Sequence, residues 1–176
     1  MHRLLAHSIL LLALFASGCA TRSITTREVD AAQQAWGEAI VAIGAAGAEG
    51  GDAESAARQA ITDLYAYDLG PVLFKPTKAA ERPFRPSFDE ALSYFVGGAI
   101  DEDHGFALQP WSVVRFGDQR MFIDRDSAAA MGLYYFTDAN SGVETPVEFT
   151  FGYRKDNRGR LRIFLHHSSL PYQPNP

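Results

Sequence analysis

The order of apolar and polar residues divides the chain into a helical first half and a β-rich second half. Between residues 31 and 43, apolar side chains recur every three or four positions, which predicts an amphipathic helix. That helix is expected to begin near Glu28 and to end in the alanine- and glycine-rich segment 44–51. Asp52 is placed to cap a second helix, predicted to run to about Tyr67.

Prolines and a capping serine organise the middle of the chain. Segment 71–77 is predicted to be extended, because Pro76 cannot stand inside a helix. Ser87, followed three residues later by Glu90, has the pattern of a capping box and predicts a short helix that Gly97 and its neighbour terminate.

From Trp111 onward the hydrophobic period changes to two, which is typical of strands. Short polar segments between the apolar runs predict antiparallel hairpins. Helices followed by a curved antiparallel sheet, in a chain of this length, predict one domain of the α+β class. The candidate strands include residues 113–115, 121–123, 128–136, 147–153 and 161–169, and the predicted turns lie at 117–118, 138–142 and 156–159.

The last predicted strand starts apolar and ends polar. Strict alternation places His167 and Ser169 on the face of its apolar residues, and His166 and Ser168 on the opposite face. We therefore expect His167 and Ser169 at the end of an apolar stripe, where the core opens into a pocket. The structural alternative is a polar strand end at the rim of the sheet that carries no chemistry.

The N-terminus has the pattern of a secretion signal. A basic start is followed by an apolar run over residues 4–15, which is too short to span a bilayer. The small residues before Cys19 resemble the lipobox of bacterial lipoproteins, which implies a signal peptide over 1–18, lipid on Cys19, a tether over 19–27 and a folded domain over 28–176. The alternative is an ordinary signal peptide with an incidental cysteine.

Charge and cysteine content narrow the classes of function. The formal net charge of −5 offers no basic surface for nucleic acid. Cys19 is the single cysteine, so no disulfide stabilises the domain. Membrane association would come through the lipid on Cys19 alone. Ala20 after it, in place of an aspartate retention signal, indicates the periplasmic face of the outer membrane in a two-membrane cell.

The histidines after the signal do not favour a metal site. His166 and His167 point to opposite faces of a regular strand and cannot share one ion, which makes a tri-histidine zinc site with His104 unfavourable. The segment 101–104 combines carboxylates with His104 and leaves a loop metal site open, against the simpler reading of a solvated acidic turn. No Gly-x-Ser-x-Gly elbow surrounds Ser169. The residues alone therefore indicate a small-molecule pocket.

Taken together, the ordered motifs resemble the iota-class carbonic anhydrases, and most closely their branch that works without a metal. The resemblance spans roughly residues 64–172. It is carried by LFKPT at 73–77, FRP at 84–86 continuing through Phe88 to the glycines at 97–98, EDHGF at 102–106, FTFGY at 149–153 and HHSSLPY at 166–172.

The resemblance implies a cone-shaped nuclear transport factor 2-like fold and the reversible hydration of carbon dioxide to bicarbonate and a proton, with no cofactor. It implies a pocket formed by Thr77, Tyr94, His167 and Ser169, in which Thr77, Tyr94 and Ser169 bind the substrate. A homodimer is also expected. The alternative is a lipid-anchored small-ligand binding or association domain of the same fold without turnover.

Overall fold

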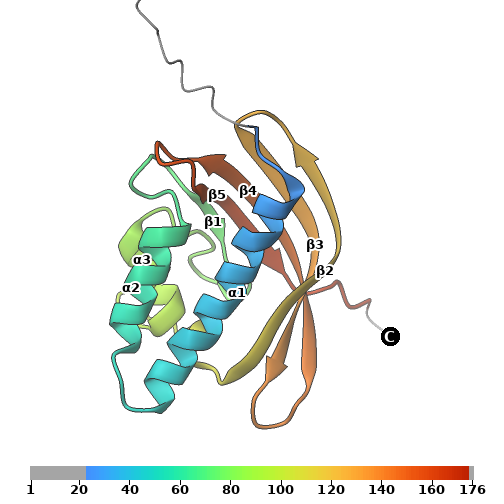
Figure 1. Cartoon of the computed structure of the whole chain (residues 1–176). Coiled ribbons are helices and arrows are strands. Elements are labelled where there is room, and N and C mark those ends of the chain that lie inside the picture. Colours follow the sequence, from blue (N-terminus) through green and yellow to red (C-terminus); the bar gives the residue numbers. More distant parts are fainter. Residues whose placement is uncertain (1–22, 175–176) are drawn as a thin grey trace, which may run out of the picture.

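In the computed structural model, which describes residues 23–174, three helices pack against one face of a strongly curved five-stranded sheet (Figure 1). The predicted α+β class is confirmed. The elements in chain order are α1 (Thr26–Ala48), α2 (Ala53–Leu64), β1 (Leu73–Lys75), α3 (Phe88–Val96), a 3₁₀ turn (Phe106–Leu108), β2 (Trp111–Ile123), β3 (Ser127–Asp138), β4 (Glu144–Lys155) and β5 (Leu161–Ser169).

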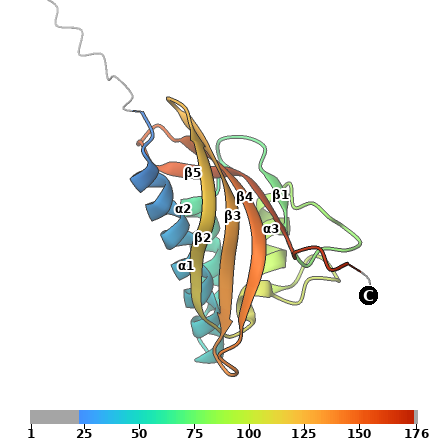
Figure 2. The same cartoon turned by 90° about the vertical axis from the view of Figure 1, so that its right-hand side faces the viewer.

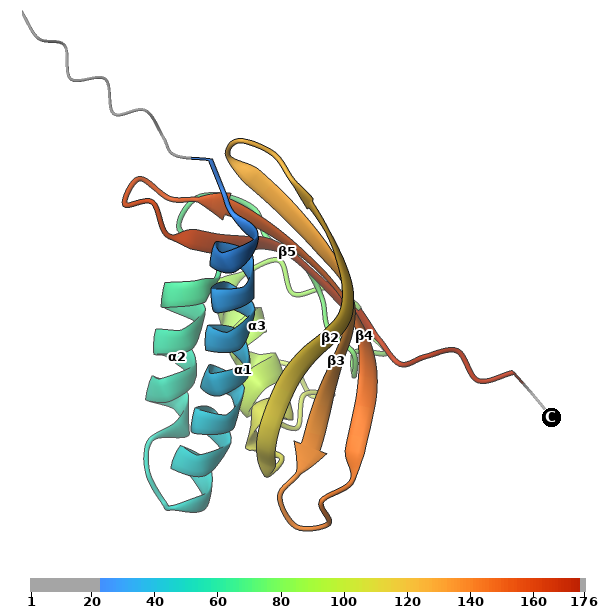
Figure 3. The ribbon, with the colours of Figure 1, turned by 45° about the vertical axis from the view of Figure 1, so that its right-hand side comes forward.

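The sheet has the strand order β1-β5-β4-β3-β2. The strands β2 to β5 form an antiparallel meander, and β1 adds to its edge parallel to β5. Figure 2 shows the long strands of the meander, and Figure 3 shows how their curvature wraps the sheet around the helices. The parallel pairing of β1 with β5 carries the loop that follows β1 to the end of the last strand.

Helix starts follow the predicted caps, with two corrections to helix limits. Thr25 and Glu28 form a capping box, so α1 begins at Thr26 rather than at Glu28. Ile24, 4% exposed, is already buried, so the predicted tether is shorter than expected at its C-terminal end. The helix α2 begins after Asp52 as predicted but ends at Leu64, because Tyr65 turns to an extended conformation and bridges to Ile163 of β5.

The predicted turn at Gly117 and Asp118 is wrong. The strand β2 continues through these residues from Trp111 to Ile123, and an irregularity in its pairing with β3 lies between Gly117 and Arg120. A β-bulge absorbs a residue with unusual backbone angles without ending the strand, and Asp118 has a φ of 46°. The turn of this hairpin lies after Ile123 instead.

An aromatic core fills the space between the helices and the sheet. Trp36 of α1 contacts rings of β2, β3, β4 and β5, among them Tyr134 and Phe151 at 5.6 Å each. Phe149, Phe151 and Tyr153 of β4 face this core, and all three are at most 2% exposed. Within residues 23–174, no helix combines the length and apolar character needed to cross a membrane.

Candidate active site

A bulge in β5 determines which residues of the last strand face the core. Tyr153 of β4 pairs with Ile163, whereas the residue before it, Gly152, pairs with Leu165. Phe164 is therefore an extra residue in β5. An extra residue reverses the alternation beyond it. After the bulge it is therefore His166 and Ser168 whose side chains turn inward, and they are 2% and 3% exposed.

The predicted placement of His167 and Ser169 on the core-facing side is wrong for the same reason. His167 is exposed and pairs in register with Thr150 and with Lys75. The Ser169 hydroxyl donates a hydrogen bond to the exposed carboxylate of Glu148 at 2.8 Å. Both side chains lie on the outer face of the sheet, away from the residues described next.

Four hydroxyl groups from four elements meet at the inner end of β5. Thr77, just after β1, donates a hydrogen bond from Oγ1 to Ser168 Oγ at 2.9 Å. The hydroxyl of Tyr94 on α3 lies close to Thr77, and that of Tyr134 on β3 lies close to both Thr77 and Ser168. We call Thr77, Tyr94, Tyr134 and Ser168 the hydroxyl cluster. Tyr94 and Thr77 were predicted for the site, whereas Tyr134 and Ser168 were missed.

The tyrosines of the hydroxyl cluster are held in their protonated form. Burial raises the pKa of Tyr94 and of Tyr134 well above the ordinary tyrosine value, and the neighbouring polar groups offset this only in part. At neutral pH both hydroxyls therefore carry their proton and can donate a hydrogen bond. A buried neutral hydroxyl suits the binding of an oxygen-rich small molecule.

His166 lies beside the hydroxyl cluster, inside an aromatic cage. Its ring stacks on Phe74 at a centroid distance of 4.7 Å and lies 4.2 Å from the ring of Phe151. Its Nδ1 is 2.8 Å from the Tyr65 hydroxyl. Burial, with a smaller effect of the neighbouring His167, holds the pKa of His166 well below its usual range, so the ring is neutral at physiological pH.

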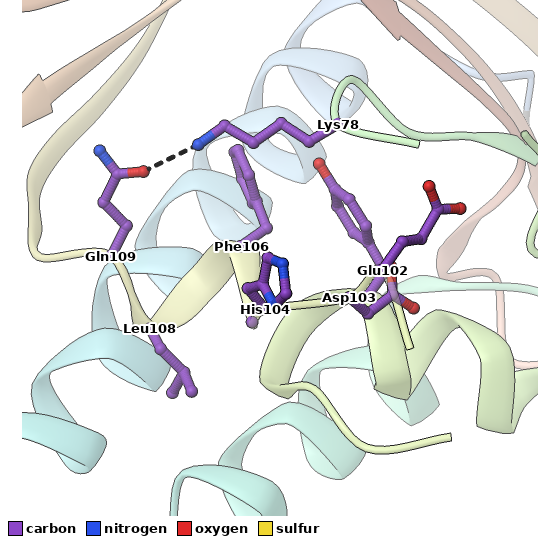
Figure 4. Close-up of a pocket in the computed structure, with 9 residues that line it drawn as sticks. Lys78, Glu102, Asp103, His104, Phe106, Leu108 and Gln109 are labelled. Carbon is purple, nitrogen blue, oxygen red and sulfur yellow. Dashed lines mark hydrogen bonds between the residues drawn. The ribbon is translucent and has the colours of Figure 1, made fainter. Parts of the chain in front are cut away.

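Tyr94 lines a pocket of about 430 Å³, and Figure 4 shows the side chains around it. Phe106 stacks on the Tyr94 ring at 5.3 Å and forms part of the same wall. Lys78 spans the opening and donates to Gln109 at 3.1 Å, and the exposed His104 lies below Phe106 in the view. Tyr94 is the one member of the hydroxyl cluster that lines this pocket.

The acidic loop beside this pocket is occupied by protein contacts. Glu102 accepts hydrogen bonds from the backbone N–H groups of Glu81, Ala80 and Arg82, which lower its pKa to about 2. Asp103 pairs with the buried Arg85 at 2.6 Å. Both carboxylates thus hold the 80–85 loop in place, which argues against the loop metal site considered for 101–104. Over residues 23–174, no group of three His, Cys, Asp or Glu side chains is arranged to hold a metal ion.

One sequence signal could have revealed the inward residues of β5. Gly152 stands in the interior of a strand, where glycine often marks a bulge or a close approach. A Cβ atom at this position would lie 2.9 Å from Phe164 Cζ and 3.0 Å from Leu165 Cβ. The glycine therefore marks the place where the alternation of β5 changes.

Comparison with known proteins identifies the family. The family model of the metal-independent carbonic anhydrases matches residues 27–170. A metal-independent carbonic anhydrase from a Nostoc species is 48% identical over 157 residues, which cover 86% of this chain and 76% of that protein. The chain belongs to the metal-independent carbonic anhydrases.

Solved structures agree with this assignment. The crystal structure of a cyanobacterial iota-carbonic anhydrase, complexed with bicarbonate, superposes with a TM-score of 0.83 at 46% identity, covering 87% of this chain and 96% of that one. A nuclear transport factor 2-like protein from Novosphingobium aromaticivorans, at 12% identity, has a TM-score of 0.53 over 82% of this chain and 80% of its own. The second likeness bears on the fold alone. It confirms the predicted nuclear transport factor 2-like fold.

This carbonic anhydrase is therefore an enzyme that hydrates carbon dioxide, as the resemblance implied. The alternative of an association domain without turnover is set aside by the family membership. Of the four residues expected in the site, Thr77 and Tyr94 come together, while His167 and Ser169 lie on the other face of the sheet.

Proposed function

We propose that this carbonic anhydrase hydrates carbon dioxide at the hydroxyl cluster, next to the pocket that Tyr94 lines. The observation that supports this most strongly is the hydrogen bond of Thr77 to Ser168, which joins two hydroxyls inside an otherwise aromatic interior. Buried polar groups in such surroundings are costly unless they have partners or a ligand. The neighbouring aromatic rings supply apolar walls for the gas.

The reaction requires a bound water, a dry site for carbon dioxide and an exit for one proton. The water oxygen forms a bond to the carbon of carbon dioxide, and the products are bicarbonate and a proton. We assign the water and the developing bicarbonate oxygens to Ser168, Thr77 and Tyr94. Tyr134, protonated at neutral pH and close to Ser168 and Thr77, is assigned as a further donor.

The proton leaves through the same hydroxyls. A hydroxyl can accept a proton on its oxygen while it gives its own to the next group, so Ser168, Thr77 and Tyr94 form a relay once the Thr77 hydroxyl, which donates to Ser168 at rest, turns toward Tyr94. The relay ends at the pocket beside Tyr94, which opens past Lys78 and His104. Water and buffer in that pocket then take the proton to bulk solvent.

Bicarbonate binding at the hydroxyl cluster is part of the proposal. The cyanobacterial relative was crystallised with bicarbonate, and the two chains share 46% identity. Neutral hydroxyl donors hold a monoanion without the tight attraction that a fixed positive charge would give, which favours release of the product.

The test compares two neighbouring serines on opposite faces of β5. Carbon dioxide hydration is measured by stopped flow on protein treated with a strong chelator. Ser168→Ala is expected to lower kcat/KM about a hundredfold, as loss of a positioned hydroxyl does in other active sites. Ser169→Ala, which removes only the exposed contact with Glu148, is the matched control and should stay within about twofold of the wild type. Full activity of Ser168→Ala, or an equal loss in both variants, would place the chemistry elsewhere.

We also propose that the enzyme is a lipoprotein of the cell envelope, attached through Cys19 to the periplasmic face of the outer membrane. The support is the sequence pattern at residues 1–20, which lies outside the described residues. In cell fractionation, the wild type should sediment with membranes and Cys19→Ser should not be lipidated. Lipid labelling that persists in Cys19→Ser would overturn this proposal.

A homodimer formed through the outer face of the sheet is a further part of the proposed biology. Phe122 and Met131 are 73% and 62% exposed on that face. Exposed apolar side chains of this size on neighbouring strands are suited to contact with a second copy. Light scattering on the purified enzyme measures its mass, and a monomer at micromolar concentration would contradict the prediction.

A further inference from the structure

Three buried side chains form a hydrogen-bonded chain behind the hydroxyl cluster. Trp36 Nε1 donates to the hydroxyl oxygen of Tyr65 at 2.9 Å, and the same hydroxyl lies 2.8 Å from His166 Nδ1. All three residues are 2% exposed. They come from α1, from the residue that follows α2 and from β5, so that these hydrogen bonds join both long helices to the last strand.

The direction of these hydrogen bonds follows from the chemistry of the groups. An indole N–H can only donate, so Tyr65 must accept from Trp36. Within residues 23–174, the Tyr65 hydroxyl has one other hydrogen-bond partner, His166 Nδ1. Nδ1 is thus the one acceptor that the described residues offer to the Tyr65 proton, and we take Nδ1 to accept it. A neutral imidazole that accepts at Nδ1 carries its proton on Nε2.

The Nε2 atom of His166 is buried and has no hydrogen-bond partner among the described residues. Nε2 lies on a different side of the ring from Nδ1 and therefore does not face Tyr65. Fully buried N–H groups are rarely left without an acceptor. An unpaired buried donor on the inner face of β5, which Ser168 shares two residues further along the strand, therefore indicates a place for a ligand oxygen.

We propose that Trp36 and Tyr65 are positioning residues that fix His166 as the Nε2–H tautomer, and that this N–H donates to an oxygen of bicarbonate. His166 then binds and orients the product. It does not take the proton from water, because Nε2 already carries a proton and has no free lone pair. This inference rests on the proposed function of the hydroxyl cluster and adds a donor and its support to it.

The tautomer can be measured directly by nitrogen NMR on the ¹⁵N-labelled full chain at pH 7.5. The signals of His166 are identified by their absence in His166→Gln. We expect Nδ1 to show the shift of an unprotonated nitrogen and Nε2 that of a protonated one. On titration with bicarbonate, the Nε2–H resonance should move. A protonated Nδ1 overturns the tautomer, and an Nε2–H signal unchanged by bicarbonate overturns its contact with the ligand.

Tyr65→Phe tests the role of the chain in positioning. The variant keeps the ring but removes the hydroxyl, so Nδ1 loses its donor and the imidazole can take either tautomer. We expect a mixed tautomer signal and a loss of kcat/KM of roughly tenfold, the effect of one lost hydrogen bond that orients a ligand-binding group. An unchanged His166 spectrum in Tyr65→Phe would overturn the positioning role.

The matched control is Tyr67→Phe. Tyr67 stacks on Tyr65 at 6.0 Å, and its hydroxyl donates to the backbone oxygen of Arg85 instead of to His166. Its loss should leave the His166 signals unchanged, and a tautomer shift in this variant would also contradict the positioning role of Tyr65. Failure of the proposed function is seen separately: if Ser168→Ala keeps full activity while wild-type His166 shows the Nε2–H tautomer, the hydroxyl cluster is wrong and the tautomer stands.

Discussion

The inner and outer faces of β5 carry the same residue types with opposite surroundings. His166 and Ser168 are buried among aromatic rings and hydroxyls, whereas His167 is exposed and Ser169 contacts an exposed glutamate. Each pair has one imidazole and one hydroxyl at the same spacing. The difference between them is therefore one of environment. Burial keeps His166 neutral and leaves its Nε2 without a hydrogen-bond partner among the described residues, and the proposed ligand site rests on this difference from the outer face.

Strand β3, which is separated from β5 by β4, repeats this contrast and provides the sharpest test of it. Tyr134 lies in the hydroxyl cluster, while the hydroxyl of Tyr135 donates to the exposed Asp118 at 2.8 Å on the outer face. Tyr134→Phe should lower kcat/KM about a hundredfold, because a buried donor to the developing bicarbonate is lost. Tyr135→Phe should stay within about twofold.

Stopped-flow hydration assays with both variants, together with their unfolding midpoints, decide this prediction. If both variants remain folded and have equal activities, the inner face of β3 has no part in the reaction. A loss of activity confined to Tyr134→Phe would support the inclusion of β3 in the proposed site.

The next largest effect is expected at Gly152, next to the bulge that determines which side chains of β5 face inward. Gly152→Val adds a Cβ atom that would lie 3.0 Å from Leu165 Cβ, and the rest of the valine side chain needs further space. The bulge must therefore shift. We expect a loss of about 1–3 kcal/mol in the free energy of unfolding, as for overpacked positions, and a parallel loss of activity.

Urea unfolding measures this change, and Ala129→Val is its control. Ala129 pairs with Gly152 across β3 and β4, and it is exposed. Its replacement should change the free energy of unfolding by less than about 0.5 kcal/mol. Equal stability of the two variants would mean that the bulge does not depend on the glycine.

The smallest effect concerns the pH dependence of stability. The folded-state pKa of His166 is depressed, while the unfolded chain titrates near the usual 6.5. Below that pH the unfolded state binds a proton that the folded state does not, so stability falls as the pH falls, by up to about 1.4 kcal/mol per pH unit. Unfolding midpoints between pH 7.5 and 5.5 should therefore decrease less in His166→Gln than in the wild type.

The outer-face variant His167→Gln is the comparison for this experiment. Its pH profile should follow that of the wild type closely, because His167 is exposed. If His167→Gln flattened the profile and His166→Gln did not, the assignment of the two faces would be reversed.

Much of the fold was readable from local patterns. The capping boxes at Thr25 and Ser87 involve contacts within one helical turn, and the sequence predicted the second of them directly. The strand regions followed from the period of two. The limits of elements were less predictable where a distant contact decides them, as at Tyr65, which leaves α2 to bridge to Ile163.

The site was predictable in part. Thr77 and Tyr94 were assigned to the candidate site only because the motifs around them resemble a known family, since a threonine after a strand and a tyrosine on an amphipathic helix have no local signal of chemistry. Tyr134 was missed for the same reason: it is one aromatic residue in a strand full of them, and only its position opposite Thr77 and Ser168 distinguishes it.

By itself, the sequence determined the elements, the α+β class and the segments that hold the site, because periodicity, caps and motifs act over a few residues. Tertiary structure alone decided which face of β5 is the inner one. A single extra residue, Phe164, accommodated by Gly152 on the neighbouring strand, reverses the alternation and exchanges His167 and Ser169 for His166 and Ser168. Pairing between strands sets that register, and no pattern within β5 contains it.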